Sequence, residues 1–304
     1  MAVFLGTPAA AVPALAAFSD VVDVDLVVTR PDRPKGRRRT LVPPPVKVAA
    51  EEWGMPVAQP ASRAELLGVM EAAAPEVALV VAYGRILSPD VIATSTLGFL
   101  NVHFSLLPRW RGAAPVERAI LEGDETTGVS LMLIDQGLDS GPVLAVIETP
   151  IGEDETGGSL TARLSYLGAK MVDDIVPEFM AGRVVPAPQF SGGVTEAPPL
   201  SREEARIDGS WDADRAARAV RAFRPRPGAW VDIDGEAVKI HGAARSDADV
   251  EPGIVVAIAG TPFLGLEQGA LELARVQAPG KQPVSGREWM NGRRGEPGRV
   301  RPAG

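Results

Sequence analysis

Three polar side chains near the middle of the chain have the chemistry for acyl transfer. Asn101 and His103 stand two residues apart at the end of an apolar run, and Asp139 lies on a glycine-flanked loop after the next apolar run. An amide can donate a hydrogen bond to an acyl oxygen that gains negative charge. A neutral imidazole can carry a proton from an attacking amine to a leaving nitrogen, and a nearby carboxylate can orient that imidazole. These residues predict direct attack by an amine, without a covalent enzyme intermediate.

The composition removes several rival chemistries. The chain has 304 residues and no cysteine, which excludes disulfides, cysteine zinc sites, iron–sulfur clusters and thiol nucleophiles. It has 2 histidines, His103 and His241, so a site made of several histidines is excluded and we expect no metal. His241, in the run VKIH, is more typical of a barrel residue near a strand end. An Asn-x-His pair also serves as ordinary polar capping, so the spacing alone leaves the substrate open.

Alternating strand and helix signals indicate how the three residues are positioned. Apolar runs typical of strands are Ala2–Leu5, Asp25–Thr29, Glu76–Ala82, Gly98–His103, Gly128–Asp135 and Val143–Thr149, and a helix is expected at about Ser159–Ala181. This pattern predicts an α/β domain with a Rossmann-like, doubly wound parallel sheet. The two-residue period of a strand places Asn101 and His103 on the same face. Ligands of such sheets bind at the carboxyl ends of the strands, where these residues stand.

The C-terminal third has a different pattern. Residues 182–204 are rich in proline and glycine and predict a linker. A helix is expected at about Asp212–Phe223, and short strand-like runs follow it, with Asp234-Gly235 as a hairpin turn. We therefore expect a catalytic domain over residues 1–181 and a small β-barrel over residues 205–304.

The charge is unevenly distributed. The formal net charge is −8, but residues 30–47 carry 7 basic residues and 1 acid, a balance of +6. The rest of residues 1–200 carries 8 basic and 23 acidic residues, a balance of −15. Prolines in the basic segment exclude helix or central strand, so we expect an extended basic loop that could grip a phosphate backbone. A merely solvated charged face is the alternative interpretation.

Long motifs in the chain resemble the folate-dependent formyltransferases. The central match is Asn101–Gly112 (NVHFSLLPRWRG), followed by Gly137–Gly141 (GLDSG). Further matching pieces are Phe4–Pro8 (FLGTP), Thr29–Asp32 (TRPD), Val81–Gly84 (VAYG), Ser201–Asp208 (SREEARID), Arg221–Trp230 (RAFRPRPGAW), Pro279–Lys281 and Asn291–Arg294 (NGRR). The resemblance covers essentially the whole chain.

The resemblance implies transfer of a formyl group from 10-formyltetrahydrofolate to the amino group of methionine on initiator tRNA, in translation initiation. The family's catalytic residues match Asn101, His103 and Asp139. Its folate-binding residues match Ser105, Leu106, Leu107 and Pro108, and the loop with Val81, Tyr83, Gly84 and Ile86 resembles a wall of its folate pocket. Its tRNA-contacting insertion matches Arg33, Lys35, Arg37, Arg38 and Arg39. The C-terminal barrel resembles the family's OB-like, tRNA-contacting domain.

Some features depart from the family, and two other functions remain open. Phe104 stands where many relatives have glycine or alanine, and Pro198 and Pro199 stand where relatives often have lysine. The alternatives are a formyltransferase that acts on a nucleotide or sugar amine, and a tRNA-binding module without activity.

The uncharged segment from Met1 to Phe18 has no basic start and contains prolines, which indicates a strand and helix and not a signal peptide. We expect a cytoplasmic monomer that does not bind a membrane.

Overall fold

The computed structural model describes residues 1–36 and 40–302, and it divides into two compact units. The first comprises residues 1–115, 126–150 and 161–197, and the second comprises residues 116–125, 151–160 and 198–304. We describe each unit by itself. Within the described ranges, no helix is both long and apolar enough to cross a bilayer.

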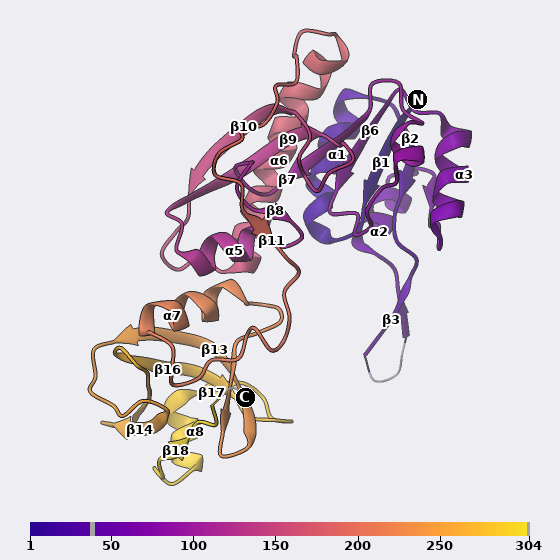
Figure 1. Ribbon diagram of the computed structural model, residues 1–304. Coiled ribbons are helices and arrows are strands. Elements are labelled where there is room, and N and C mark those ends of the chain that lie inside the picture. The colour runs from indigo at the N-terminus through magenta and orange to yellow at the C-terminus, as the bar shows by residue number, and fades with distance from the viewer. Residues whose placement is uncertain (37–39, 303–304) are drawn as a thin grey trace. The chain divides into compact units, whose positions relative to one another are not determined.

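The first unit is built on a seven-stranded sheet in the order β10-β9-β7-β6-β1-β2-β5 (Figure 1). The strands are β1 (Ala2–Gly6), β2 (Val24–Val28), β5 (Val57–Ala58), β6 (Val77–Val81), β7 (Phe99–His103), β9 (Thr126–Leu133) and β10 (Val143–Pro150). The five strands from β5 to β7 are parallel. β9 and β10 pair antiparallel at one edge, which the expected parallel sheet did not include. The Rossmann-like α/β fold class is confirmed, with this antiparallel extension.

Alternating side chains of β1 pack against helices on opposite faces of the sheet. The helices of this unit are η1 (Ala9–Ala11), α1 (Val12–Val21), α2 (Pro45–Glu52), α3 (Arg63–Ala73), α4 (Pro89–Ile92) and most of α6 (Gly157–Met180), whereas α5 (Pro115–Glu122) falls almost wholly in the second unit. Val3 and Leu5 join one apolar cluster with Leu66 of α3, whereas Phe4 faces the other way and lies 6.5 Å, between ring centroids, from Phe18 of α1. Burial on both faces explains why the central strands are continuously apolar.

The basic segment forms a two-stranded antiparallel ribbon of β3 (Arg33–Lys35) and β4 (Thr40–Val42). It projects away from the sheet in Figure 1. We expected an extended loop with neither helix nor central strand, and the segment instead pairs with itself as a ribbon. This ribbon of three pairs tolerates Pro34 because it has no further neighbour that needs the missing N–H. Residues 37–39, at the tip, lie outside the described residues.

Part of the expected linker belongs to the first unit. β11 (Glu196–Ala197) pairs in parallel with β8 (Arg111–Gly112), the last two residues of the motif Asn101–Gly112. Ala187 also forms a bridge with Val143 of β10. These contacts extend the first unit past residue 181, the expected end of the catalytic domain. A proline-rich composition indicated irregular structure, but it gave no sign that the segment pairs with the sheet domain.

The second unit is a nearly closed antiparallel barrel with strand order β12-β13-β16-β15-β14-β18. Its elements are α7 (Ala213–Ala222), β12 (Trp230–Ile233), β13 (Glu236–Ser246), β14 (Ile254–Ile258), β15 (Thr261–Gly265), β16 (Ala270–Gln277), β17 (Val284–Ser285), α8 (Gly286–Gly292) and β18 (Gly298–Arg299). A bridge between Ile233 and Val300 joins the two ends of this order. The expected hairpin is confirmed, because Ile233 pairs with Glu236.

Candidate active site

A cavity of about 810 Å³ lies at the carboxyl ends of β6 and β7 and is bordered by the loop after β9. Asn101, His103 and Asp139 all line it. The side chains come together as the sequence predicted: Asn101 Nδ2 lies 3.5 Å from Asp139 Oδ1, and His103 Nδ1 lies 3.6 Å from Asp139 Oδ2. The roles of the three residues in catalysis stay predictions.

A backbone carbonyl orients the ring of His103. Its Nε2 lies 2.8 Å from the carbonyl oxygen of Trp110, and the side chain is 6% exposed. Because a carbonyl can only accept a hydrogen bond, Nε2 carries the proton and donates it. In the neutral imidazole, Nδ1 is therefore the basic atom, and it is the nitrogen nearest the Asp139 carboxylate. We expected Asp139 to orient the imidazole, but the shorter contact is the one to Trp110.

The carboxylate of Asp139 is held by the backbone of β8. Gly112 donates its N–H to Asp139 Oδ2 at 2.8 Å. Residue 112 must be glycine for two reasons: its φ is 123°, and a Cβ there would lie 2.7 Å from the carbonyl oxygen of Ala197. Asp139 itself has a φ of 46°, an uncommon conformation for a residue other than glycine. The pairing of β8 with β11 thus determines where the carboxylate lies.

Gln189 supports the same loop, and sequence reasoning missed it. Its Nε2 donates to the carbonyl oxygens of Asp139 at 2.7 Å and Gly141 at 2.9 Å. Its Oε1 accepts two hydrogen bonds from the guanidinium of Arg111, at 3.1 and 2.6 Å. One side-chain amide therefore links the backbone of Asp139 to β8, which holds the carboxylate of Asp139. Gln189 lies in the expected linker, where no pattern of residues indicated a function.

The four residues that match the family's folate-binding tetrapeptide do not line the cavity. Ser105 is fully buried and donates to the carbonyl of Arg109 at 2.6 Å, while its own carbonyl accepts from Ser130 at 2.7 Å. Leu107 donates its N–H to Ser130 Oγ at 3.1 Å. Leu106 and Pro108 complete this turn. The tetrapeptide therefore shapes the chain between His103 and Trp110, and its contact with folate stays a prediction.

The loop after β6 forms the opposite wall of the cavity. Tyr83, Gly84 and Ile86 line it, whereas Val81 does not. Thr7 holds this loop by donating its hydroxyl to the carbonyl of Tyr83 at 2.8 Å. Ile86 is 91% exposed, so this wall includes an apolar side chain that faces solvent. Such a partly apolar wall with backbone polar groups suits a flat heterocyclic ligand.

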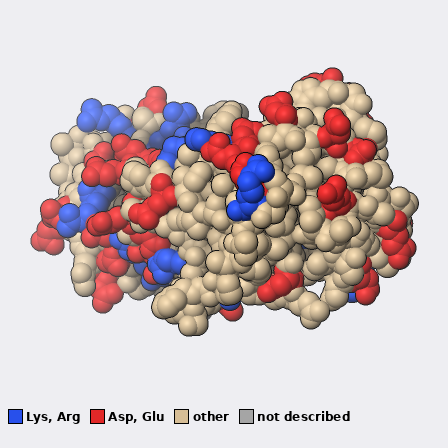
Figure 2. All heavy atoms as spheres, turned by 90° about the horizontal axis from the view of Figure 1, so that it is seen from above, with Lys and Arg blue, Asp and Glu red and all other residues tan. Residues whose placement is uncertain are grey.

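Of the residues predicted to contact tRNA, Arg33 and Lys35 lie on β3. Arg33 is exposed. Arg37, Arg38 and Arg39 lie outside the described residues, so their contact with tRNA stays a prediction. Figure 2 shows one face of the molecule, part of which carries mostly acidic side chains. The acidic side chains on this face agree with the negative charge balance of the sequence outside residues 30–47.

Metal binding is a separate question from these contacts. Within residues 1–36 and 40–302, no three histidine, aspartate or glutamate side chains come together as a metal site would require.

Comparison with known families matches both units. The model of the formyl transferase family matches residues 5–176. The model of the formyl transferase C-terminal domain matches residues 199–294. The chain is 46% identical over 298 residues to the methionyl-tRNA formyltransferase of Xylella fastidiosa strain M12, covering 96% of this chain and 97% of that protein. It is 45% identical over 306 residues to the methionyl-tRNA formyltransferase of Halorhodospira halophila, covering 97% of each.

Solved structures of low identity show the same fold. The sugar 3N-formyl transferase WlaRD, solved with dTDP and 5-N-formyl-THF, superposes with a TM-score of 0.68 at 14% identity, covering 92% of this chain and 98% of that one. The methionyl-tRNA formyltransferase from Clostridium thermocellum superposes with a TM-score of 0.55 at 17% identity, covering 82% and 94%. At these identities the likeness concerns the fold alone.

Proposed function

The chain belongs to the formyl transferase family, and on that premise we propose that it transfers the formyl group of 10-formyltetrahydrofolate to the amino group of methionyl initiator tRNA. The observation that supports this proposal most is the convergence of Asn101, His103 and Asp139 on one cavity. Relatives about 45% identical over nearly their whole length are methionyl-tRNA formyltransferases.

The geometry supports a separate role in formyl transfer for each of Asn101, His103 and Asp139. As the amine attacks, a C–N bond forms at the formyl carbon and the bond to the donor nitrogen breaks. The amide of Asn101 donates a hydrogen bond to the formyl oxygen, which gains negative charge. His103 Nδ1 accepts the proton that the amine loses and returns it to the leaving nitrogen. Asp139, 3.6 Å from Nδ1, stabilises the imidazolium between these two transfers.

The cavity fits a folate-sized donor. Its volume of about 810 Å³ lies in the usual range for small-molecule sites. Apolar side chains of Val80, Met132 and Ile134 line it beside the backbone of the 82–84 loop. We assign the donor to this cavity, with Tyr83, Gly84 and Ile86 along one wall.

One assay tests the function. The protein is incubated with 10-formyltetrahydrofolate and charged initiator tRNA, and formylmethionine is measured. The wild type should form it, and Asn101→Ala and His103→Ala should each lower kcat by at least ~10²-fold, the loss expected for an oxyanion donor or a general base. His241→Ala is the matched control, because His241 lies on the barrel and contacts Gln277.

Each outcome separates the alternatives. Absence of formylmethionine with the wild type would contradict the proposed function. Product on a sugar amine but not on tRNA would favour the nucleotide- or sugar-amine formyltransferase. If tRNA binds but no acceptor is formylated, the protein is a binding module. Full turnover by Asn101→Ala or His103→Ala would show that the assigned roles are wrong.

A further inference from the structure

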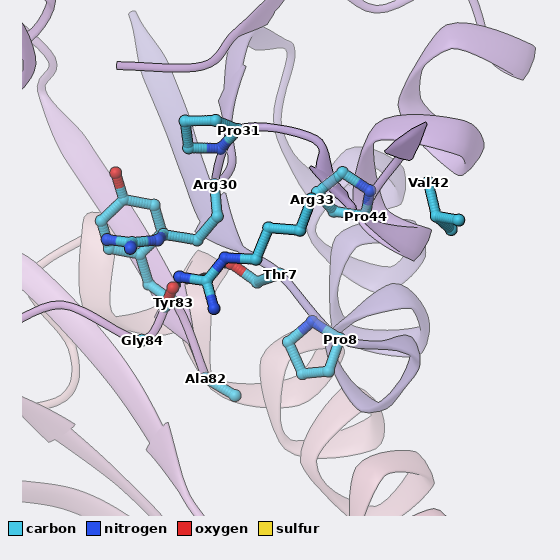
Figure 3. A pocket seen from close by; sticks show the side chains of 10 residues that line it. All are labelled: Thr7, Pro8, Arg30, Pro31, Arg33, Val42, Pro44, Ala82, Tyr83 and Gly84. Atoms are coloured by element: carbon cyan, nitrogen blue, oxygen red, sulfur yellow. Dashed lines mark hydrogen bonds between the residues drawn. The ribbon is translucent and has the colours of Figure 1, made fainter. Parts of the chain in front are cut away.

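A second cavity, of about 270 Å³, lies at the carboxyl ends of β1, β2 and β6 (Figure 3). It is lined by Thr7, Pro8, Arg30, Pro31, Arg33, Val42, Pro44 and residues 82–84. Ala82, Tyr83 and Gly84 also line the active-site cavity. The loop of residues 82–84 therefore lies between the two cavities. A molecule bound in the second cavity would lie next to the active-site cavity.

Two cationic side chains extend into this second cavity. Figure 3 shows Arg30 and Arg33 reaching across it toward the side where Tyr83 lies. The only acid of the basic segment, Asp32, is already engaged by Lys47 at 3.1 Å and by Gln59 at 2.8 Å. In the described part of the chain, neither arginine has a carboxylate partner within ion-pair distance.

Two residues that line this cavity each have a buried polar atom without a hydrogen-bond partner among the described residues. Arg30 Nε and the hydroxyl of Tyr83 are both buried, and neither has a hydrogen-bond partner among the described residues. Tyr83 is 2% exposed. Buried polar groups are nearly always paired, so the unpaired Nε of Arg30, a residue that lines the cavity, indicates a ligand that offers acceptor oxygens to this guanidinium.

We propose that Arg30 and Arg33 bind a phosphodiester group of the acceptor's single-stranded end. This inference rests on the proposed function, which makes the acceptor an aminoacylated RNA. Planar guanidinium groups bind phosphate oxygens through two parallel hydrogen bonds. Arg33 is also the first residue of β3, so the cavity is lined by residues of the basic segment 30–47. A polyanion lying along the ribbon reaches the cavity directly, whereas a carboxylate tail of the donor would have to cross the 82–84 loop.

Comparison of two small acceptors measures the effect of the phosphodiester group alone. The methionyl ester of adenosine and the methionyl ester of adenosine 5′-(methyl phosphate) differ by this one group. The wild type should use the phosphorylated acceptor with a kcat/KM at least about tenfold higher, as expected for charge-assisted hydrogen bonds. In the Arg30→Ala/Arg33→Ala variant this ratio should fall to near one. Arg63→Ala, which removes an exposed arginine paired with Asp90, should keep the wild-type ratio.

Further measurements keep the test decisive. Calorimetric binding of adenosine 5′-(methyl phosphate) reports on the site without turnover, and the double alanine variant should bind it at least about tenfold more weakly. If that variant does not fold, Arg30→Lys/Arg33→Lys should keep the charge but lose most of the preference. An unchanged ratio in a folded variant overturns the proposal. The proposal is also overturned if the double alanine variant has a raised KM for a polyglutamylated donor but an unchanged kcat/KM ratio for the two acceptors. The arginines would then bind the donor's tail. Failure of the wild type on charged tRNA counts instead against the proposed function.

Discussion

At the level of single residues, the candidate active site depends on groups that hold the side chains proposed to be catalytic and that are not themselves proposed to react. Trp110 and Gly112 supply a carbonyl and an N–H that fix His103 and Asp139. Gln189 holds the backbone of Asp139 through the carbonyl oxygens of residues 139 and 141. The precision of the site therefore comes from surrounding backbone and amide groups.

Gln189 should affect turnover more than substrate binding. Gln189→Glu retains an acceptor for Arg111, but it replaces the NH2 group that donates both hydrogen bonds by a carboxylate oxygen that faces two carbonyl oxygens. We expect kcat to fall about tenfold or more, because the Asp139 loop loses two hydrogen bonds and gains repulsion. KM for charged tRNA should change little. Steady-state kinetics of Gln189→Glu, Gln189→Ala and the exposed control Gln282→Ala measure this. Equal changes in the two Gln189 variants and the control would contradict a positioning role.

Tyr83 should make stability fall at high pH. Burial raises the pKa of Tyr83 from 10.0 to about 12. The folded state thus favours the neutral phenol, so stability is complete below pH 10 and is lost as the pH rises toward 12. The loss approaches about 3 kcal/mol. Urea unfolding between about pH 9 and 12 should show a shallower decline for Tyr83→Phe than for the wild type or the exposed control Tyr166→Phe. Identical curves for all three would contradict the assignment.

The convergence of Asn101, His103 and Asp139 could be predicted from the sequence, but the groups that support them could not. Asn101 and His103 share a strand, so their proximity follows from the two-residue period. The hydrogen bonds of Gln189 and Gly112 join segments far apart in the chain, and no local pattern indicates such pairs. The motif around Ser105 gave no sign that its side chain is fully buried in a turn, and the predicted contact of the motif with folate stays a prediction.

At the level of elements, the pairing of β8 with β11 connects fold and site. Gly112→Ala should place a Cβ 2.7 Å from the carbonyl of Ala197, which forces the two strands apart and moves the N–H that holds Asp139. We expect the free energy of unfolding to fall by about 1–3 kcal/mol, and kcat to fall with it. Gly182→Ala is the matched control, because Gly182 also has a positive φ of 70° but nothing within 4 Å of its would-be Cβ. Similar losses in both variants would mean that backbone conformation alone matters.

Elements with local signals were predictable, and those formed by distant pairing were not. The Asp234-Gly235 turn indicated its hairpin because both residues tolerate positive φ, and their φ values are 53° and 89°. The helix α8 was missed although Ser285 and Glu288 form a capping box, a pattern that the sequence contains. The antiparallel direction of β9 and β10 could not be read from their apolar runs, since buried strands look alike in either direction.

At the level of the whole molecule, the uneven charge should control tRNA binding. Replacing Arg37, Arg38 and Arg39 by glutamine should weaken binding and reduce the slope of log Kd against log salt by about 0.7–0.9 for each phosphate that is no longer neutralised. The control replaces Arg63, Lys170 and Arg183, which removes the same charge from exposed ion pairs. Filter binding at several salt concentrations compares the two variants. An equal change of slope in both would indicate a general effect of net charge and no specific binding by the ribbon.

The pairing of β8 with β11, called here the β8–β11 seam, also limits where the formyl-transfer unit can be joined to another C-terminal domain. A junction at residue 181, where the composition changes, would discard Gln189, Thr195 and Ala197. These residues bond the Asp139 loop, the N–H of Trp110, and the N–H groups of residues 113 and 114. A junction after Ala197 would keep them all. Chimeras that give this formyl-transfer unit a new C-terminal module, whether made in the laboratory or by gene fusion, should therefore be active only when the crossover falls after the seam.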